Sequence, residues 1–409
     1  MGGRTLKVIQ ELSLPLIAGV VAALVWANVD PHGYHALIHE PIAGGVSLHF
    51  LVNDIFMALF FGIAAGEITE SCLPGGALNP PRRAVNPLLG TVGGVLGPIA
   101  VFFAWMAITG DHSLRNGWGI PTATDIAIAW LVARVAFGAR HPAVSYLLLL
   151  AVADDGIGLA IIAVFYPDPH HPVQPIYLLI VAAAMGAAYA LRRRKVASFW
   201  PYVLGPGVVS WWGLHLTGVH PALALVPIVP MLPTSGIDLG LFEDAEDAMP
   251  DPLNRFTHTF KLPVDLGLFA FGLANAGVEL SSVGNATAAV AIALAVGKTC
   301  GVFSFAILAH RLGFPLPTGI DLRTLVLAGM TAGLGLTVAL FVAGVAFTDP
   351  HLQGAAKMGA LLSVVVAPVV ITLARVLRIE RWTDARAPDA DGGDPAYASG
   401  DEHRDVASL

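Results

Sequence analysis

Two adjacent aspartates lie near the middle of an apolar run that is long enough to cross a bilayer. The run is residues 143–166, and leucine, isoleucine and alanine flank Asp154 and Asp155 on both sides. An ionised aspartate at the centre of a membrane helix costs at least ~2.5 kcal/mol, so acids at that depth usually mark a functional site. The alternative is a pair that partner side chains neutralise for packing alone. Successive helical positions point about 100° apart, so we expect the two carboxylates to have different roles.

The composition indicates what kind of element holds these acids. The chain has 409 residues, of which 56% are hydrophobic and only 12% are charged. Repeated apolar runs of about 20 residues are typical of membrane-spanning helices, whereas barrel strands would show short alternating segments. We therefore predict an all-α polytopic membrane protein with twelve transmembrane helices, at residues 12–29, 49–68, 88–109, 120–136, 143–166, 176–191, 202–218, 221–232, 264–278, 286–309, 324–347 and 358–377.

The distribution of basic residues predicts the orientation in the membrane. With a cytoplasmic N-terminus, Lys298 falls inside a span, Arg115 and Lys357 fall outside, and all other Lys and Arg residues fall on the cytoplasmic side. This asymmetry follows the positive-inside rule and places both termini in the cytoplasm. Cys72 and Cys300 have no disulfide-framework or metal-ligand spacing, so we expect reduced packing residues.

Two further spans are interrupted by residues that break helices. The fourth contains Ile-Pro-Thr-Ala-Thr-Asp at 120–125, and the eleventh contains Gly-Met-Thr-Ala-Gly-Leu-Gly-Leu at 329–336. Backbone that leaves helical geometry at membrane depth must line a cavity or be buried in protein. Interrupted spans in matching positions of two halves point to a transporter site. The alternative is two kinked packing helices.

The span count makes these interruptions equivalent. Spans three to five and ten to twelve each have the break in the middle member, and the two triplets run in opposite directions, which predicts an inverted repeat with two broken, crossing helices. Such a crossing brings like helix ends together. Asp125 could compensate the positive N-terminal ends, and Lys298 could compensate the negative ends or pair with Asp154. The alternative for the lysine is snorkelling toward the membrane surface.

Several segments together are similar to those of NhaA-type sodium/proton antiporters. They are IPTATDIAIA, LLAVADDGIGLAIIAVFY, SWWGLHLTGVHPALALVP, FGLANAGVEL, VGKTCGVFS and AGMTAGLGLTVALFVAGVAF, in collinear order across most of residues 8–377. The resemblance implies a secondary active transporter, not an enzyme, that exchanges cytoplasmic Na⁺ or Li⁺ for external H⁺. Exchange would be electrogenic and pH-dependent, with a role in sodium and pH homeostasis.

The resemblance also implies roles for particular residues. Asp155 is similar to the principal ion-binding aspartate, so Asp155 and Asp154 would bind Na⁺, and Lys298 resembles the lysine that exchanges contact with Asp154. Thr124 and Asp125 fall on the unwound segment, where the carboxylate balances helix dipoles and assists binding.

Two residues are candidates for the pH response that the resemblance implies. They are Glu67 and His220, and a lone histidine can equally be structural. The charged cluster that family members have after Glu67 is largely missing here, and Glu70 reverses the expected sign. Asp265, in the ninth span, has no role that the resemblance supplies.

Domains, partners and location follow from the same resemblance. Residues 1–380 would form the transmembrane antiporter domain of a bacterial inner-membrane protein, and residues 381–409 a disordered acidic cytoplasmic tail. We expect no cofactor and no nucleic acid; the partners would be sodium, protons, the lipid bilayer and a second copy in a homodimer. The external segment 30–49 is shortened where the family carries a dimer-forming β-hairpin.

Two other classes of protein remain open at this point. Another ion-coupled carrier, for example of an organic anion, could share the inverted repeat. An intramembrane enzyme is the second, but Asp154 and Asp155 stand in DDGIG, not in the DDxxD of a prenyltransferase, and the GxGD of an aspartyl protease is absent from the sequence. The sequence has no phosphate-binding loop, so an ion gradient supplies the energy.

Overall fold

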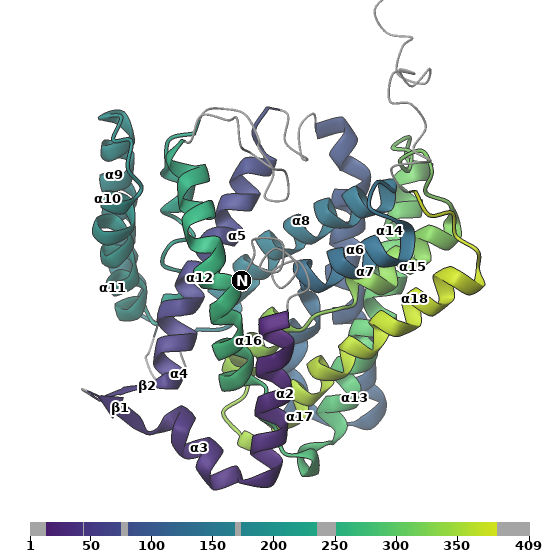
Figure 1. Cartoon of the computed structure of the whole chain (residues 1–409), viewed down its shortest axis with the longest axis horizontal. Coiled ribbons are helices and arrows are strands. Elements are labelled where there is room, and N and C mark those ends of the chain that lie inside the picture. The colour runs from purple at the N-terminus through teal and green to yellow at the C-terminus, as the bar shows by residue number, and fades with distance from the viewer. Residues whose placement is uncertain (1–13, 44, 75–80, 168–172, 235–250, 383–409) are drawn as a thin grey trace, which may run out of the picture.

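The computed structural model describes residues 14–43, 45–74, 81–167, 173–234 and 251–382, and the chain is mostly helical there (Figure 1). Most of the predicted tail, residues 383–409, lies outside these ranges. Six described helices are long and apolar enough to cross a membrane, and two bent helix pairs raise that number to eight. The six are Leu48–Ser71, Ala84–Thr109, Pro142–Phe165, Pro175–Arg193, Asn285–Arg311 and Pro350–Val376.

The helices form two regions, of which the first combines the N-terminal segment with a later helix. Its elements are α2 (Leu14–Val29), α3 (Pro31–His39), the antiparallel hairpin β1 (Pro41–Ala43) and β2 (Val46–Ser47), α4 (Leu48–Phe50), the π-helical turn Leu51–Phe56, α5 (Met57–Ser71) and α12 (Pro252–Asn275). Helix α12 packs along α2. The approach is close because Gly272 has no side chain: a Cβ there would lie 2.8 Å from the carbonyl oxygen of Leu16.

Three helices stand at the edge of this region in Figure 1: α9 (Leu178–Arg193), α10 (Trp200–Tyr202) and α11 (Val208–Thr217). The following segment, 221–232, was expected to be a helical span, and the structure corrects this expectation. It contains only two 3₁₀ turns, Pro221–Leu223 and Val229–Met231. Prolines 221, 227 and 230 remove the N–H donors that a continuous helix needs.

The second region contains the two interrupted spans, each between two long helices. The first set is α6 (Pro81–Thr109), the 3₁₀ helix His112–Thr122, α7 (Ile126–Phe137) and α8 (Pro142–Phe165). The second set is α13 (Asn285–Ile292), the π-helical turn Ala293–Lys298, α14 (Thr299–Arg311), α15 (Leu322–Ala332), α16 (Thr337–Ala346), α17 (Pro350–Leu362), the 3₁₀ turn Ser363–Val365 and α18 (Val366–Val376). The chain bends by 59° at the first interruption and by 47° at the second.

The two sets are joined by a glycine contact between α6 and α14. A Cβ at Gly97 would lie 2.8 Å from the Cα of Gly301, and one at Gly297 would lie 2.7 Å from the Cα of Pro98. Small residues four positions apart on both helices let membrane helices approach backbone to backbone. This contact brings the helix that carries Lys298 against the first set.

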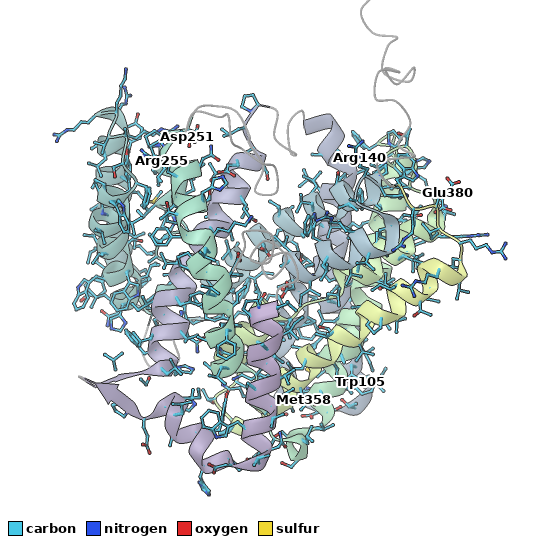
Figure 2. All side chains as sticks on the ribbon, in the orientation of Figure 1. Trp105, Arg140, Asp251, Arg255, Met358 and Glu380 are labelled. Carbon is cyan, nitrogen blue, oxygen red and sulfur yellow. The ribbon has the colours of Figure 1, made fainter. Side chains whose placement is uncertain are left out.

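Side chains distinguish the two ends of the molecule. Figure 2 shows Arg140, Asp251, Arg255 and Glu380 at one end and Trp105 toward the other. The first end holds the turn between α7 and α8, the start of α12 and the residues after α18. These are the segments that the basic-residue distribution predicts to be cytoplasmic.

Candidate ion-binding site

The buried acid and base of the membrane helices form an ion pair. Lys298 Nζ lies 2.7 Å from Asp154 Oδ2, and both side chains are fully buried. The same ammonium donates to the carbonyl oxygen of Thr122 at 2.5 Å. Lys298 ends a π-helical turn, a distortion often found at functional sites. The lysine therefore joins the second set of helices to both Asp154 and the last carbonyl of the first half-helix.

The first interruption, between Thr122 and α7, leaves backbone and side-chain polar groups that α-helical hydrogen bonds do not satisfy. The Thr124 hydroxyl donates to the carbonyl of Ala332 at 2.9 Å, and the Asp125 N–H donates to that of Leu334 at 2.6 Å. Both acceptors belong to the second interruption, so each break satisfies backbone groups that the other leaves unpaired. Thr124 and Asp125 are themselves buried.

Asp125 caps two helices at once. Its Oδ1 accepts from the N–H of Ile128 in α7 at 3.1 Å, and its Oδ2 accepts from the N–H of Thr337 in α16 at 3.3 Å. The N-terminus of a helix carries a partial positive charge, and a carboxylate there is stabilising. One side chain thus accepts hydrogen bonds from the N-terminal ends of two half-helices.

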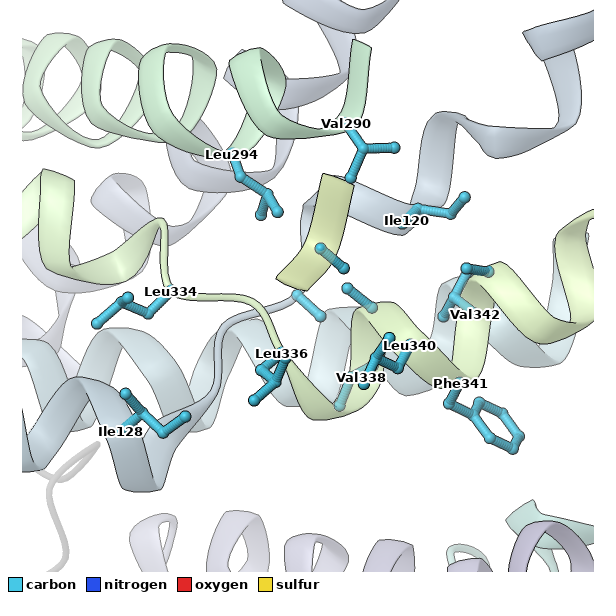
Figure 3. Close-up of a cluster of buried hydrophobic side chains, with 14 of the residues drawn as sticks. Ile120, Ile128, Val290, Leu294, Leu334, Leu336, Val338, Leu340, Phe341 and Val342 are labelled. Atoms are coloured by element: carbon cyan, nitrogen blue, oxygen red, sulfur yellow. The ribbon is translucent and has the colours of Figure 1, made fainter. Parts of the chain in front are cut away.

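The second interruption has no charged side chain and is shaped by glycine. A Cβ at Gly333 would lie 2.6 Å from the carbonyl oxygen of Leu294, and one at Gly335 would lie 2.6 Å from that of Ala123. The Gly335 N–H donates to the Ser363 hydroxyl at 3.3 Å. Figure 3 shows the two extended links passing each other among apolar side chains that include Leu294, Leu334 and Leu336.

Asp155 differs from its neighbour in its surroundings. It is partly exposed where Asp154 is fully buried, and its electrostatic neighbours are Asp154, Glu67, Asp125 and Lys298. Among the described residues, the buried Oδ1 atoms of both Asp155 and Asp154 have no hydrogen-bond partner, so the two carboxylates share this feature. A carboxylate oxygen in this position can accept a proton or a cation, since a hard cation such as sodium binds carboxylate, hydroxyl and carbonyl oxygens.

Glu67 lies on α5, at the contact between the two regions. It interacts electrostatically with Asp155 on α8 and with Lys261 and Asp265 on α12. Asp265, which had no predicted role, therefore belongs to the charged surroundings of Glu67.

His220 lies elsewhere. Its Nδ1 accepts from the N–H of Ala222 at 3.3 Å, and its ring centroid is 4.9 Å from that of Phe341 on α16. His220 thus contacts the second half of the broken helix through Phe341.

The sequence did not predict several residues and contacts that support the site. Ser363 is one, and its signal was a single serine in an apolar span. The α6–α14 contact is another, and the spacing of Gly93 and Gly97 with Gly297 and Gly301 could have revealed it. The carbonyls of Thr122, Ala332 and Leu334 carry no side-chain signal, because only the folded backbone brings them to the site.

The arrangement of broken helices around buried acids and a lysine is that of a secondary transporter. The family model for "Na+/H+ antiporter 1" matches residues 4–374. The chain is 60% identical to the Na⁺/H⁺ antiporter NhaA of Geobacter metallireducens and 58% identical to that of Geobacter sulfurreducens, covering in both cases 92% of this chain and 99% of the relative. The chain belongs to this family, and it is a sodium/proton antiporter.

The architecture is also similar to a solved structure of a more distant antiporter. The sodium proton antiporter MjNhaP1 from Methanocaldococcus jannaschii aligns with a TM-score of 0.50 at 15% identity, over 92% of this chain and 99% of that one. This likeness concerns the fold alone. With the family match, it confirms the predicted multi-span all-α membrane fold. The family match and the curated relatives confirm a secondary transporter and not an intramembrane enzyme.

Proposed function

We propose that Asp155 is the carboxylate at which sodium and protons compete, with Asp154 as the second Na⁺ ligand. The observation that carries this proposal is that Asp155 Oδ1 is buried beside the Asp154–Lys298 pair and has no hydrogen-bond partner among the described residues. A protonated carboxylate cannot hold sodium with its full charge, so binding of one ion opposes binding of the other.

Lys298 forms an ion pair with Asp154 when no sodium is bound. Its ammonium is shared between Asp154 Oδ2 and the Thr122 carbonyl, so a cation that draws Asp154 away leaves the lysine with a backbone partner. Lys298 thereby couples the arrival of sodium to a change at the first broken helix.

Thr124 and Asp125 assist from the unwound segment. The carboxylate of Asp125 stays on the two helix N-termini, where it keeps the crossing assembled and adds negative potential next to Asp155. The Thr124 hydroxyl, in the same segment, supplies an additional oxygen ligand for sodium.

Glu67 and His220 are the proposed residues for the pH response. Glu67 is supported by its electrostatic contact with Asp155, so its own protonation changes the potential at the site. His220 acts at a distance, through Phe341 on the second half of the broken helix.

The setting of the exchanger is part of the proposal. It is an inner-membrane protein with both termini in the cytoplasm, and it exchanges cytoplasmic Na⁺ for external H⁺ electrogenically. The hairpin β1–β2 offers a short edge for a homodimer. Residues 381–409 are proposed to lie in the cytoplasm, and the first two of them, Arg381 and Trp382, contact the membrane domain.

The test is Asp155→Asn in proteoliposomes, with sodium-driven collapse of a pH gradient as the readout. The amide keeps the size of the side chain but removes the titrating charge, so exchange should be lost while the protein stays folded in detergent. Near-normal exchange in this variant rules out Asp155 as the shared site.

A sodium titration of the unaltered protein at several pH values completes the test. Competition predicts that apparent sodium affinity falls about tenfold per pH unit below the pKa of the site for one displaced proton. Saturating sodium should restore most activity in acid. A maximal rate that falls with constant apparent affinity would contradict simple competition.

A further inference from the structure

The residues after α18 fold back over the end of the molecule that carries Arg140 and Glu380 (Figure 2). The N–H of Trp382 donates to the carbonyl of Phe137 at 3.0 Å, and the N–H of Arg140 donates to the carbonyl of Trp382 at 3.4 Å. The Arg381 guanidinium donates to the carbonyl of Val135. Residues 379–382, which we call the strap, are thus held by backbone and side chain.

The indole of Trp382 touches the corners of both sets of helices. Its ring lies 5.3 Å from that of His141, centroid to centroid. On its other side it packs on Gly319, where a Cβ would lie 3.1 Å from the indole. One side chain therefore contacts the α7–α8 turn of the first set and the connection before α15 in the second.

Glycine makes the backbone contact feasible. Gly138, the residue after α7, has φ of 93°, and a Cβ there would overlap the backbone of Trp382. A residue with a side chain would be strained at this φ and would also push the strap away.

The strap contacts the ends of α7 and α8, and both helices carry residues of the ion site. Helix α7 runs from its cap Asp125 to Phe137, beside the strap. Helix α8, which carries Asp154 and Asp155, begins beside His141, whose Nδ1 accepts from the N–H of Ala143 at 3.1 Å. Trp382 therefore holds the far ends of both helices that supply the carboxylates.

The two corners also touch directly, since a Cβ at Gly319 would lie 3.4 Å from Cγ of Pro142 in α8. A cavity of about 410 Å³ lies between the strap and the start of α15, lined among others by Ile320, Asp321, Arg323 and Leu377. Ile379, Glu380 and Trp382 also line this cavity, so the strap adds a second contact between the two corners beside the direct one.

We infer that Trp382 is a positioning residue for sodium binding. It fastens the ends of α7, α8 and α15 together, so that the two interruptions stay in register and Asp155 keeps its geometry when the site moves. This inference rests on the proposed function, in which Asp155 binds the cation.

The experiment measures sodium-dependent exchange in proteoliposomes and heat stability in detergent for matched variants. Trp382→Ala should raise the sodium concentration for half-maximal rate by about tenfold, since misplacement of binding groups weakens productive geometry. Trp382→Phe keeps an aromatic ring and should recover most of the affinity. Gly138→Ala should reproduce the defect of Trp382→Ala.

Two controls separate this role from general destabilisation. Gly313→Ala introduces the same strain at φ of 95° but meets no neighbour within 4 Å, so it should leave sodium affinity unchanged. A chain that stops after Trp382 should keep normal affinity, whereas one that stops after Glu380 should lose it.

Unchanged sodium affinity in Trp382→Ala and Gly138→Ala would overturn the inference, as would an equal loss in Gly313→Ala. If Trp382→Ala does not insert into the membrane, the chain that stops after Glu380 takes its place. Unchanged sodium affinity in that chain would also overturn the inference. Failure of the proposed function is distinguishable, because it requires Asp155→Asn to retain exchange whatever happens at Trp382.

Discussion

The first interruption, residues 123–125, carries a threonine hydroxyl and a carboxylate, whereas the second, residues 333–336, carries only glycine and leucine. The Thr124 hydroxyl donates to the carbonyl of Ala332, which ends α15, and the Asp125 N–H donates to that of Leu334 in the second interruption. The Asp125 carboxylate accepts from the N–H of Thr337. The second contributes space: at Gly335 it passes the Ala123 carbonyl where no Cβ would fit. The two breaks are thus not equivalent: the first supplies the charge, and the second allows the two backbones to approach closely.

This division has a physical reason. Two charged breaks at one crossing would place like charges in a medium of low dielectric constant, where the repulsion is poorly screened. One carboxylate suffices because it reaches both helix N-termini. The second interruption then needs no charged side chain and can contain glycine.

The largest effect should come from removing the charge that serves the first interruption. Lys298→Ala leaves Asp154 buried without its cation and the Thr122 carbonyl without its donor. Removing one partner of a buried ion pair costs about 3–5 kcal/mol, so thermal unfolding in detergent should shift strongly to lower temperature. Lys298→Arg keeps the charge and should retain partial exchange. Equal stability of the alanine variant and the unaltered protein would refute the ion pair.

The next effect should come from adding a methyl group to the second interruption. Gly335→Ala places a Cβ against the Ala123 carbonyl, and overpacking of this kind costs about 1–3 kcal/mol. Exchange should fall with stability. Gly344→Ala, in the adjoining helix α16 and with nothing within 4 Å, is the matched control and should behave normally. If both variants behave alike, the close approach does not matter.

A smaller effect should follow loss of the double cap. Asp125→Ala removes acceptors from the N–H groups of Ile128 and Thr337, and loss of a helix cap typically costs about 0.5–2 kcal/mol. Asp125→Asn retains one acceptor oxygen and should lie between alanine and the unaltered protein in unfolding temperature. Asparagine as damaging as alanine would show that charge, and not capping, is the contribution of this residue.

The smallest effect should be at Ser363. Ser363→Ala deprives the Gly335 N–H of its acceptor, which costs about 1 kcal/mol in a buried site. Sodium affinity should change little, because the serine supports a break that carries no charge. Ser281→Ala, in an exposed turn, serves as the control for hydroxyl removal. A marked loss of sodium affinity in Ser363→Ala would contradict the proposed division between the breaks.

Much of this arrangement could be predicted from sequence because its signals are local. Proline, glycine and threonine inside apolar runs located both interruptions, and an acid at 125 next to a helix start indicated a cap. The segment 221–232 could not be interpreted from its hydropathy alone, since its three prolines favour turns while its burial demands apolar side chains.

The sequence by itself determined the membrane class, the positions of the breaks and the identity of the buried charges, because hydropathy and helix breaking act over a few residues. Only the tertiary structure decided which partners meet: Lys298 with Asp154 and the Thr122 carbonyl, one carboxylate with two helix ends, and Trp382 with two corners. Most of these contacts join residues more than a hundred positions apart, and one uses a backbone oxygen, which every residue possesses. Packing of glycine against glycine between α6 and α14 brings them within hydrogen-bonding distance, and no local pattern encodes that approach.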